Sequence, residues 1–198
     1  MKKSPILSSL AAISAGLISS CATSSKPLST VGKVDLDRFM GTWYVIGYTP
    51  LGVDDDAHNA IEHYHLADNG DIETTYQFRK GSFDGELKTM TPVGRVHDEE
   101  TNAEWRMQFI WPFKAEYYIF DLSPDYQRTI IAHPNRKYAW IMARSPQIST
   151  RAYDSALSKL ETAGFDRKII QKLPQEWSNE SSRLKMIREA GKGTLKTE

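Results

Sequence analysis

The chain has 198 residues, which suffices for one domain with a substantial core and disfavours two large ones. Its 25 basic and 25 acidic residues cancel, and this balance disfavours a dedicated nucleic-acid binder, which normally carries a basic excess. Cys21 is the single cysteine, so an intramolecular disulfide and a zinc site built from several thiolates are both excluded.

The first twenty residues have the features of a secretory signal peptide. Lys2 and Lys3 give a positive start, and a short apolar stretch diluted by serines follows over residues 6–18. No segment reaches the roughly 20 apolar residues that a membrane-spanning helix needs. Residues 1–20 are therefore predicted to be a signal peptide that the mature protein lacks.

The cysteine that follows has a recognisable setting. Ile18, two serines and Cys21 resemble the bacterial lipobox, in which the cysteine becomes the acylated N-terminus after cleavage. Several acyl chains make a durable anchor, because each buried methylene contributes about 0.8 kcal/mol. Ala22 stands where lipoproteins retained in the inner membrane usually have aspartate, so the resemblance implies an outer-membrane anchor, with the domain facing the periplasm. An ordinary signal peptide with a cysteine near the cleavage point is the alternative.

Residues 21–33 are rich in serine and threonine and predict a flexible, lipidated tether. Beyond it, short alternating segments are separated by turn signals such as Asn69-Gly70, which tolerates the positive φ of tight hairpins. The predicted strands cover residues 42–49, 60–66, 72–80, 87–97, 104–110, 116–122, 128–133 and 138–143. None of the connections is long and helical enough to be a parallel crossover, so the pattern favours an antiparallel sheet.

Eight consecutive strands must dispose of their edges, and closure into an up-and-down barrel removes them. We therefore predict an all-β fold, an eight-stranded antiparallel up-and-down barrel over residues 34–177. A barrel of this size is filled by side chains or holds one small ligand. A two-layer sandwich would bury the same alternating faces, so the pattern alone does not separate the two architectures.

One helix is expected after the strands. Ser149 or Thr150 can cap it, apolar residues from Tyr153 to Leu160 recur at helical spacing, and Gly164 can end it. This C-terminal helix is expected to pack outside the barrel. Residues 178–198 are rich in charge and contain two glycines, so they predict a frayed, solvated tail.

Three motifs resemble those of the lipocalin family. Gly41-Thr42-Trp43 is similar to the Gly-x-Trp opening of the first lipocalin strand, Asp125-Tyr126 to the turn between the sixth and seventh strands, and Arg144 to the arginine that ends the last strand. The three occur in the lipocalin order and spacing. Residues 34–174 are most similar to the bacterial lipocalins, a subgroup related to apolipoprotein D, and the resemblance implies a calyx-shaped barrel.

The first and last motifs have a physical reason to occur together. Gly41 permits close approach at the barrel floor, Trp43 plugs that floor, and the guanidinium of Arg144 can stack on the indole from outside. Such a cation–π contact contributes about 0.5–2 kcal/mol. These residues, with Asp125 and Tyr126, are therefore interpreted as structural, not catalytic.

The expected ligand-binding residues follow from strand parity. If Trp43 faces inward, alternation puts Val45 and Gly47 on the same face. The residue-by-residue match to lipocalins implies that the other inward side chains are Trp105, Met107, Phe109, Tyr117, Ile119, Tyr138, Trp140 and Met142. This aromatic and thioether lining suits an acyl chain, and the tyrosines offer hydroxyls to a polar head group. The alternatives are a solid core and a register slip that turns every named side chain outward.

Other groups of polar residues carry less weight. His63 and His65 share a strand face without a third ligand nearby, so surface or barrel-lining roles are preferred to a metal site. Asp54, Asp55 and Asp56 are interpreted as the solvated acidic tip of a loop over the open end, in preference to a calcium site. No nucleophile paired with a base is visible in the sequence, so catalytic residues and cofactors are not predicted.

The resemblance implies a binding protein that stores or transports a small hydrophobic ligand, such as a fatty acid or lysophospholipid, and performs no chemistry on it. Two other functions stay open. One is an enzyme that uses a cavity tyrosine or histidine as general acid or base, and the other is an envelope scaffold with a filled barrel. The expected partners are the ligand and the outer membrane. The family also allows a homodimer, although no residue of the sequence argues for one.

Overall fold

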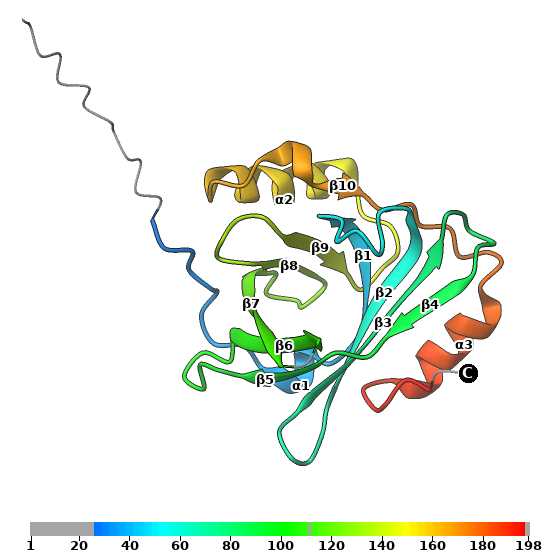
Figure 1. The fold of residues 1–198 in the computed structure, drawn as a ribbon, viewed down its shortest axis with the longest axis horizontal. Coiled ribbons are helices and arrows are strands. Elements are labelled where there is room, and N and C mark those ends of the chain that lie inside the picture. The colour runs from blue at the N-terminus through cyan, green and yellow to red at the C-terminus, as the bar shows by residue number, and fades with distance from the viewer. Residues whose placement is uncertain (1–25, 111, 197–198) are drawn as a thin grey trace, which may run out of the picture.

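The alternating segments of the sequence form strands that hydrogen-bond largely in chain order in the computed structural model, which describes residues 26–110 and 112–196. The strands are β1 (Gly41–Tyr48), β2 (Ala57–Leu66), β3 (Ile72–Lys80), β4 (Leu87–Met90), β5 (Val93–Val96), β6 (Glu104–Ile110), β7 (Phe113–Leu122), β8 (Arg128–Ala132), β9 (Ala139–Ala143) and the short β10 (Gln171–Lys172). Every pairing is antiparallel, and β9 pairs with β1, which closes the barrel (Figure 1). The predicted fold is thereby confirmed. The predicted signal peptide and Cys21 lie outside the described residues.

The fourth predicted strand is divided in two. Residues 87–97 were expected to form one strand, but β4 pairs with the outer half of β3 and β5 with its beginning. The chain breaks at Thr91-Pro92, because proline has no N–H to donate to a ladder. Together β4 and β5 take the place of one strand, and the barrel wall has eight such positions.

A bulge in β1 changes the parity of that strand. The register with β9 shifts between Val45 and Gly47, so Val45 and Tyr48 both face the interior. The expectation that Gly47 lines the interior is wrong: it lies outside, where a Cβ atom would stand 2.8 Å from the Tyr153 ring. Only glycine lets the helix that carries Tyr153 approach β1 this closely.

Three helices complete the fold: α1 (Leu36–Phe39), α2 (Thr150–Thr162) and α3 (Ser181–Ala190), with a 3₁₀ turn over Arg167–Ile169. Ser149 caps α2 as predicted, its hydroxyl accepting a 3.2 Å hydrogen bond from the Ala152 amide, and Gly164 follows the helix with φ +92°. Leu157 and Leu160 bury one face of α2 against the outside of β8, β9 and β1, whereas α3 lies beside β3 and β4 (Figure 1). Among the described residues, no helix is both long and apolar enough to cross a membrane.

The segments that flank the barrel are more ordered than their compositions predict. Residues 26–33, expected to be part of a flexible tether, run along the wall, with the Val31 amide bonded to the Ile119 carbonyl oxygen at 2.9 Å. The predicted frayed tail is wrong as well, since α3 and the residues after it pack on the outer face of β2 and β3. Arg183 and Leu195 are both buried there. Leu184 and Ile187 of α3 also pack against the apolar outer face of the barrel.

Candidate functional site

The floor of the barrel is built around Trp43, which is fully buried. Its indole nitrogen donates a 2.9 Å hydrogen bond to the carbonyl oxygen of Phe39, where α1 ends. From outside, the guanidinium carbon of Arg144 lies 3.8 Å from the centre of the Trp43 ring, and its nitrogens donate to four carbonyl oxygens between residues 38 and 42. Burial lowers the pKa of Arg144 to about 10, so it stays charged at neutral pH. The structure thus brings the tryptophan and the arginine together at the closed end.

The remaining motif residues hold the same end of the barrel. Gly41 has φ +89°, and a Cβ atom there would lie 2.9 Å from the Gly191 carbonyl oxygen. Tyr126, in the turn after β7, accepts a 2.9 Å hydrogen bond from the Asp35 amide, which begins α1. Asp125, beside it, accepts a hydrogen bond from Ser123 in the same turn, and this bond is the main reason that its pKa is lowered. These contacts fix α1 across the floor.

Most of the predicted lining residues share one buried cluster inside the barrel. Seven of them are at most 8% exposed and belong to it: Val45, Trp105, Met107, Tyr117, Ile119, Trp140 and Met142. Tyr138 is half-buried and packs against the same cluster. Phe109 does not: it is 40% exposed, because the register of β6 with β7 shifts between Met107 and Ile110 and moves the strand out of phase.

A buried carboxyl group lies among these aromatic side chains. Glu62 of β2 is opposite Trp43 of β1 on one side and Tyr76 of β3 on the other, so it points into the barrel. One of its oxygens accepts hydrogen bonds from the hydroxyls of Tyr117, at 3.1 Å, and Tyr64. Burial raises its pKa to about 7, although the bond from Tyr117 works against the increase. Sequence reasoning missed Glu62, yet Ala60, Glu62 and Tyr64 are spaced by two and share a face.

The β1–β2 loop is fastened into the open end of the barrel. Asp54 is fully buried, and its carboxylate accepts hydrogen bonds from the Tyr76 hydroxyl, at 2.9 Å, and the Leu51 amide, at 2.7 Å. The Tyr48 hydroxyl donates to the Asp54 carbonyl oxygen at 2.6 Å. Burial raises the pKa of Asp54. The prediction of a solvated acidic tip is therefore wrong for Asp54, whereas Asp55 and Asp56 are exposed.

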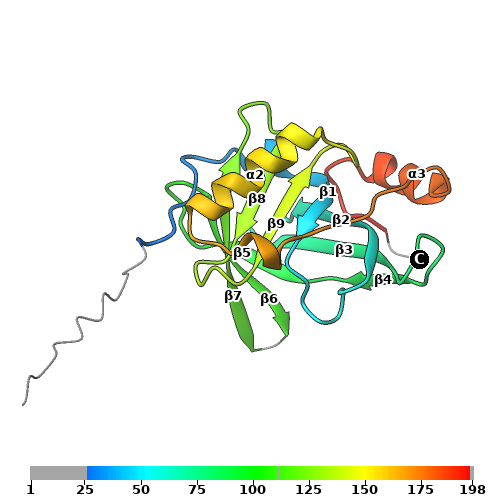
Figure 2. The same ribbon diagram turned by 90° about the horizontal axis from the view of Figure 1, so that it is seen from above.

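Exposed apolar side chains gather around the same opening. Figure 2 shows the β1–β2 loop and the β6–β7 hairpin projecting from one end of the barrel. Leu51 and Val53 in that loop, Phe83 after β3, and Phe109 and Phe113 in the hairpin are 37–75% exposed. Single exposed apolar residues are ordinary, but the four in the loop and the hairpin lie at the same end of the barrel, and such groups mark interaction surfaces.

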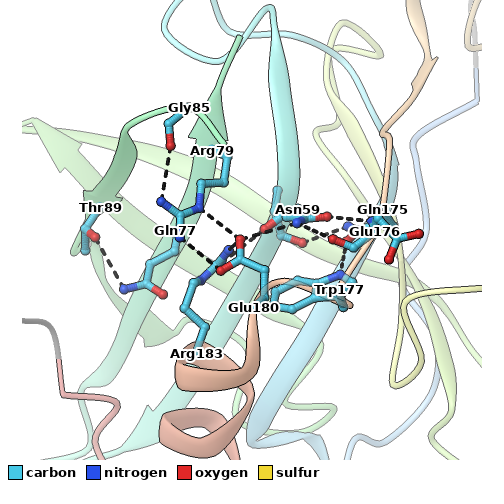
Figure 3. Close-up of polar contacts among 11 residues, drawn as sticks. Asn59, Gln77, Arg79, Gly85, Thr89, Gln175, Glu176, Trp177, Glu180 and Arg183 are labelled. Carbon is cyan, nitrogen blue, oxygen red and sulfur yellow. Dashed lines mark hydrogen bonds and ion pairs between the residues drawn. The ribbon is translucent and has the colours of Figure 1, made fainter. Parts of the chain in front are cut away.

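A second polar network fastens the C-terminal segment to the outside of the wall (Figure 3). Glu180 forms ion pairs with Arg79 of β3 and Arg183 of α3, each at 2.9 Å, and Arg183 also donates to the Asn59 carbonyl oxygen. Burial alone would raise the pKa of Glu180, but the hydrogen bond from Arg79 and the charge of Arg183 outweigh it and lower the value. The guanidinium carbon of Arg183 lies 4.7 Å from the centre of the Trp177 ring.

His63 and His65 of β2 belong to this outer face. The His63 ring bonds Thr42 Oγ1 at 2.6 Å and the Gly193 carbonyl oxygen at 2.7 Å, and the His65 ring bonds the Lys192 carbonyl oxygen at 2.9 Å. Burial lowers the pKa of His63, which favours the neutral ring. Within residues 26–110 and 112–196, no group of three or more histidine, cysteine or acidic side chains is arranged to hold a metal ion.

Comparison with known proteins gives the barrel a family. A family model described as a lipocalin-like domain matches residues 34–175. The chain belongs to the lipocalin family. The match ends at residue 175, so Glu180 and α3 of this lipocalin lie beyond the family domain.

Curated relatives cover most of this lipocalin. It is 28% identical over 170 residues to temperature-induced lipocalin-1 of Arabidopsis thaliana, a match that covers 77% of this chain and 86% of the relative. It is 26% identical over 160 residues to the outer membrane lipoprotein Blc of Escherichia coli strain K12, covering 79% and 89%. Among solved structures, insecticyanin from the tobacco hornworm has a TM-score of 0.58 at 17% identity, over 74% of this chain and 83% of that one. At such identity the structural likeness supports the fold alone.

Proposed function

We propose that this lipocalin binds a small hydrophobic ligand inside its barrel, such as a fatty acid or lysophospholipid, and stores or transports it without chemical change. The observation that carries the proposal is the barrel interior, where aromatic and methionine side chains from opposite walls form one apolar cluster. Burying apolar area contributes roughly 25 cal/mol per Å², and methionine adapts to flexible chains. Trp43 closes one end, so entry is expected through the other.

We also propose that acylated Cys21 anchors the domain to the outer membrane on the periplasmic side. The sequence around Cys21 supports the anchor, and the location is supported by relatives that are named outer membrane lipoprotein Blc. The described chain begins at the open end of the barrel, where Arg136 of the β8–β9 turn donates to the Lys26 carbonyl oxygen. Five residues reach at most about 18 Å, so the exposed apolar rim would face the lipid.

The test of ligand binding uses the full, acylated protein purified from membranes. We expect organic extraction followed by mass spectrometry to recover close to one amphiphile per barrel, while the acyl chains bonded to Cys21 stay with the protein. The Cys21→Ala variant is expected to keep the extractable amphiphile and to leave the outer-membrane fraction. This variant separates the cargo from the anchor.

Other outcomes would favour the other functions. A barrel that yields no amphiphile and takes up no added lipid would be a scaffold. Conversion of an added lipid into a product would identify an enzyme, with Glu62 the first residue to test because its pKa near 7 suits a general base. Retention of unaltered lipid at a fixed stoichiometry supports the carrier.

A further inference from the structure

Glu62 lacks the counter-charge that a buried carboxylate normally has. It is 8% exposed and faces the barrel interior between Trp43 and Tyr76. In the described part of the chain no lysine, arginine or histidine nitrogen lies within 4.0 Å of it, and its partners are two neutral tyrosine hydroxyls on one oxygen, Oε2. Buried charges are stable when they are paired, so the ionised form of Glu62 lacks a compensating positive charge.

Aromatic rings surround the carboxyl group. The Tyr117 ring stacks on Trp105 with centroids 5.5 Å apart and faces Trp140 at 6.3 Å, and Tyr64 meets Trp105 edge-on at 5.8 Å. Aromatic faces carry negative potential and attract cations within about 6 Å. A carboxylate contacted by two tyrosines of this aromatic cluster is a suitable environment for a positively charged nitrogen.

Two further features of the residues around Glu62 point to a ligand: several keep some accessible surface, and one nearby hydroxyl has no hydrogen-bond partner. Tyr76, Tyr117 and Trp140 keep 4–8% of their surface accessible, whereas Trp43, Trp105 and Tyr64 on the floor keep none. Thr74, opposite Tyr64 on β3, is 4% exposed, and its hydroxyl has no hydrogen-bond partner. Buried polar side chains are rarely unpaired, so this hydroxyl is a second sign that the interior is completed by a ligand.

We propose that Glu62, Tyr117 and Trp140 form a subsite for the positively charged nitrogen of an amphiphilic amine. The inference rests on the proposed binding function and specifies the polar group of the ligand. A cation loses hydration free energy when it enters the barrel, and attraction to the carboxylate and the aromatic rings offsets this loss. An anionic head group would meet a like charge at the same place, so it would have to stay near the opening.

The affinity for a cation should depend on pH. The groups that face Glu62 are Tyr64 of its own strand, Tyr76 of β3 and Tyr117 of β7, with Asp54 of the β1–β2 loop acting over a longer distance. Burial and negative neighbours raise the pKa values of Tyr76 and Tyr117, so both stay neutral. Glu62, with a pKa of about 7, is the group that changes charge between pH 6 and 8.

The experiment compares three amphiphiles with the same ten-carbon chain: decyltrimethylammonium, decanol and decanoate. Binding to the delipidated protein is measured by calorimetry at pH 6 and pH 8. We expect decyltrimethylammonium to bind at least tenfold more tightly than decanol at pH 8, and its affinity to rise about tenfold from pH 6 to 8 while that of decanol stays constant. The Glu62→Gln variant should lose the cation preference and keep decanol binding.

Glu73→Gln is the matched control, because Glu73 lies on β3 with its side chain exposed outside the barrel. It should behave as the wild type. Equal affinities for the cationic and neutral probes in the wild type would overturn the subsite and leave the carrier function standing. Failure of all three probes to bind would overturn both. The pH profile of the wild type decides the matter even if Glu62→Gln does not fold.

Discussion

The molecule buries two glutamates in opposite ways, one on the outer face of the barrel and one inside it. Glu180 is 4% exposed and paired with two arginines, and its pKa lies below the usual value because their charges outweigh burial. Glu62 is 8% exposed and paired with tyrosines, and burial raises its pKa to about 7. A buried carboxylate paired with arginines fixes a segment in place. A buried carboxylate without a positive partner lowers stability and can attract a positively charged ligand.

The largest expected effect comes from removing the compensated carboxylate. Glu180→Ala leaves Arg183 buried without its partner, and breaking a buried pair costs about 3–5 kcal/mol. Chemical denaturation measures the loss. Hydrogen exchange in α3 shows whether the barrel or only the C-terminal segment opens.

The control for this substitution is Glu189→Ala, since the Glu189 pair with Lys185 is exposed and its loss should change little. Equal stability of the Glu180 and Glu189 variants, with α3 amides still protected, would show that the outer network is not what holds the segment.

Removing the uncompensated carboxylate should have the opposite sign. Glu62 has a pKa of about 7 in the folded protein and about 4.5 unfolded, so the folded state binds its proton more tightly. Its contribution to stability therefore falls as pH rises from 4.5 to 7, by roughly 3 kcal/mol in total. Glu62→Gln should stabilise the ligand-free protein by up to about 3 kcal/mol at pH 8 and change little at pH 4. Denaturation at the two pH values checks this, and a destabilised variant at pH 8 would contradict it.

The smallest effect should come from the partly exposed arm of the outer network. Arg79 is 26% exposed in its side chain, and Arg183 remains to compensate Glu180 when Arg79 is replaced. Arg79→Met should cost about 1 kcal/mol, because solvent screens the pair, and should raise the pKa of Glu180. The loss is measured by denaturation and the titration by NMR. Lys80→Met, at the exposed neighbouring position, is the control, and an equal loss in both variants would deny Arg79 a specific role.

The fold and the floor of the barrel could be predicted from the sequence, but the two buried glutamates could not. Strand alternation, turn residues and closure predict the barrel, and the three lipocalin-like motifs predict which residues meet at the floor. Those signals are local or carried by rare residues such as Trp43. Glu62 was missed because a charged residue at an inward position contradicts the apolar pattern on which parity reasoning depends.

Two predictions of which side chains face the interior were wrong for the same reason. Gly47 and Phe109 were both expected inside, and in each strand a register shift precedes or surrounds the residue. A bulge inserts one residue and reverses the faces beyond it, and no composition signal announces it here. The docked C-terminal segment escaped prediction for another reason: its burial depends on Arg79 and Asn59, which are more than 100 positions away in the sequence.

The buried position of Asp54 affects the rate at which a bound ligand can leave the barrel. The loop that carries it is held by Tyr48 and Tyr76 at the open end, while Trp43 blocks the other. A molecule enclosed by the barrel would depart no faster than this loop lets go, whatever its own affinity for the walls. The contacts of Tyr48, Asp54 and Tyr76 would then set an upper limit on the rate of release, and Tyr76→Phe would raise that limit.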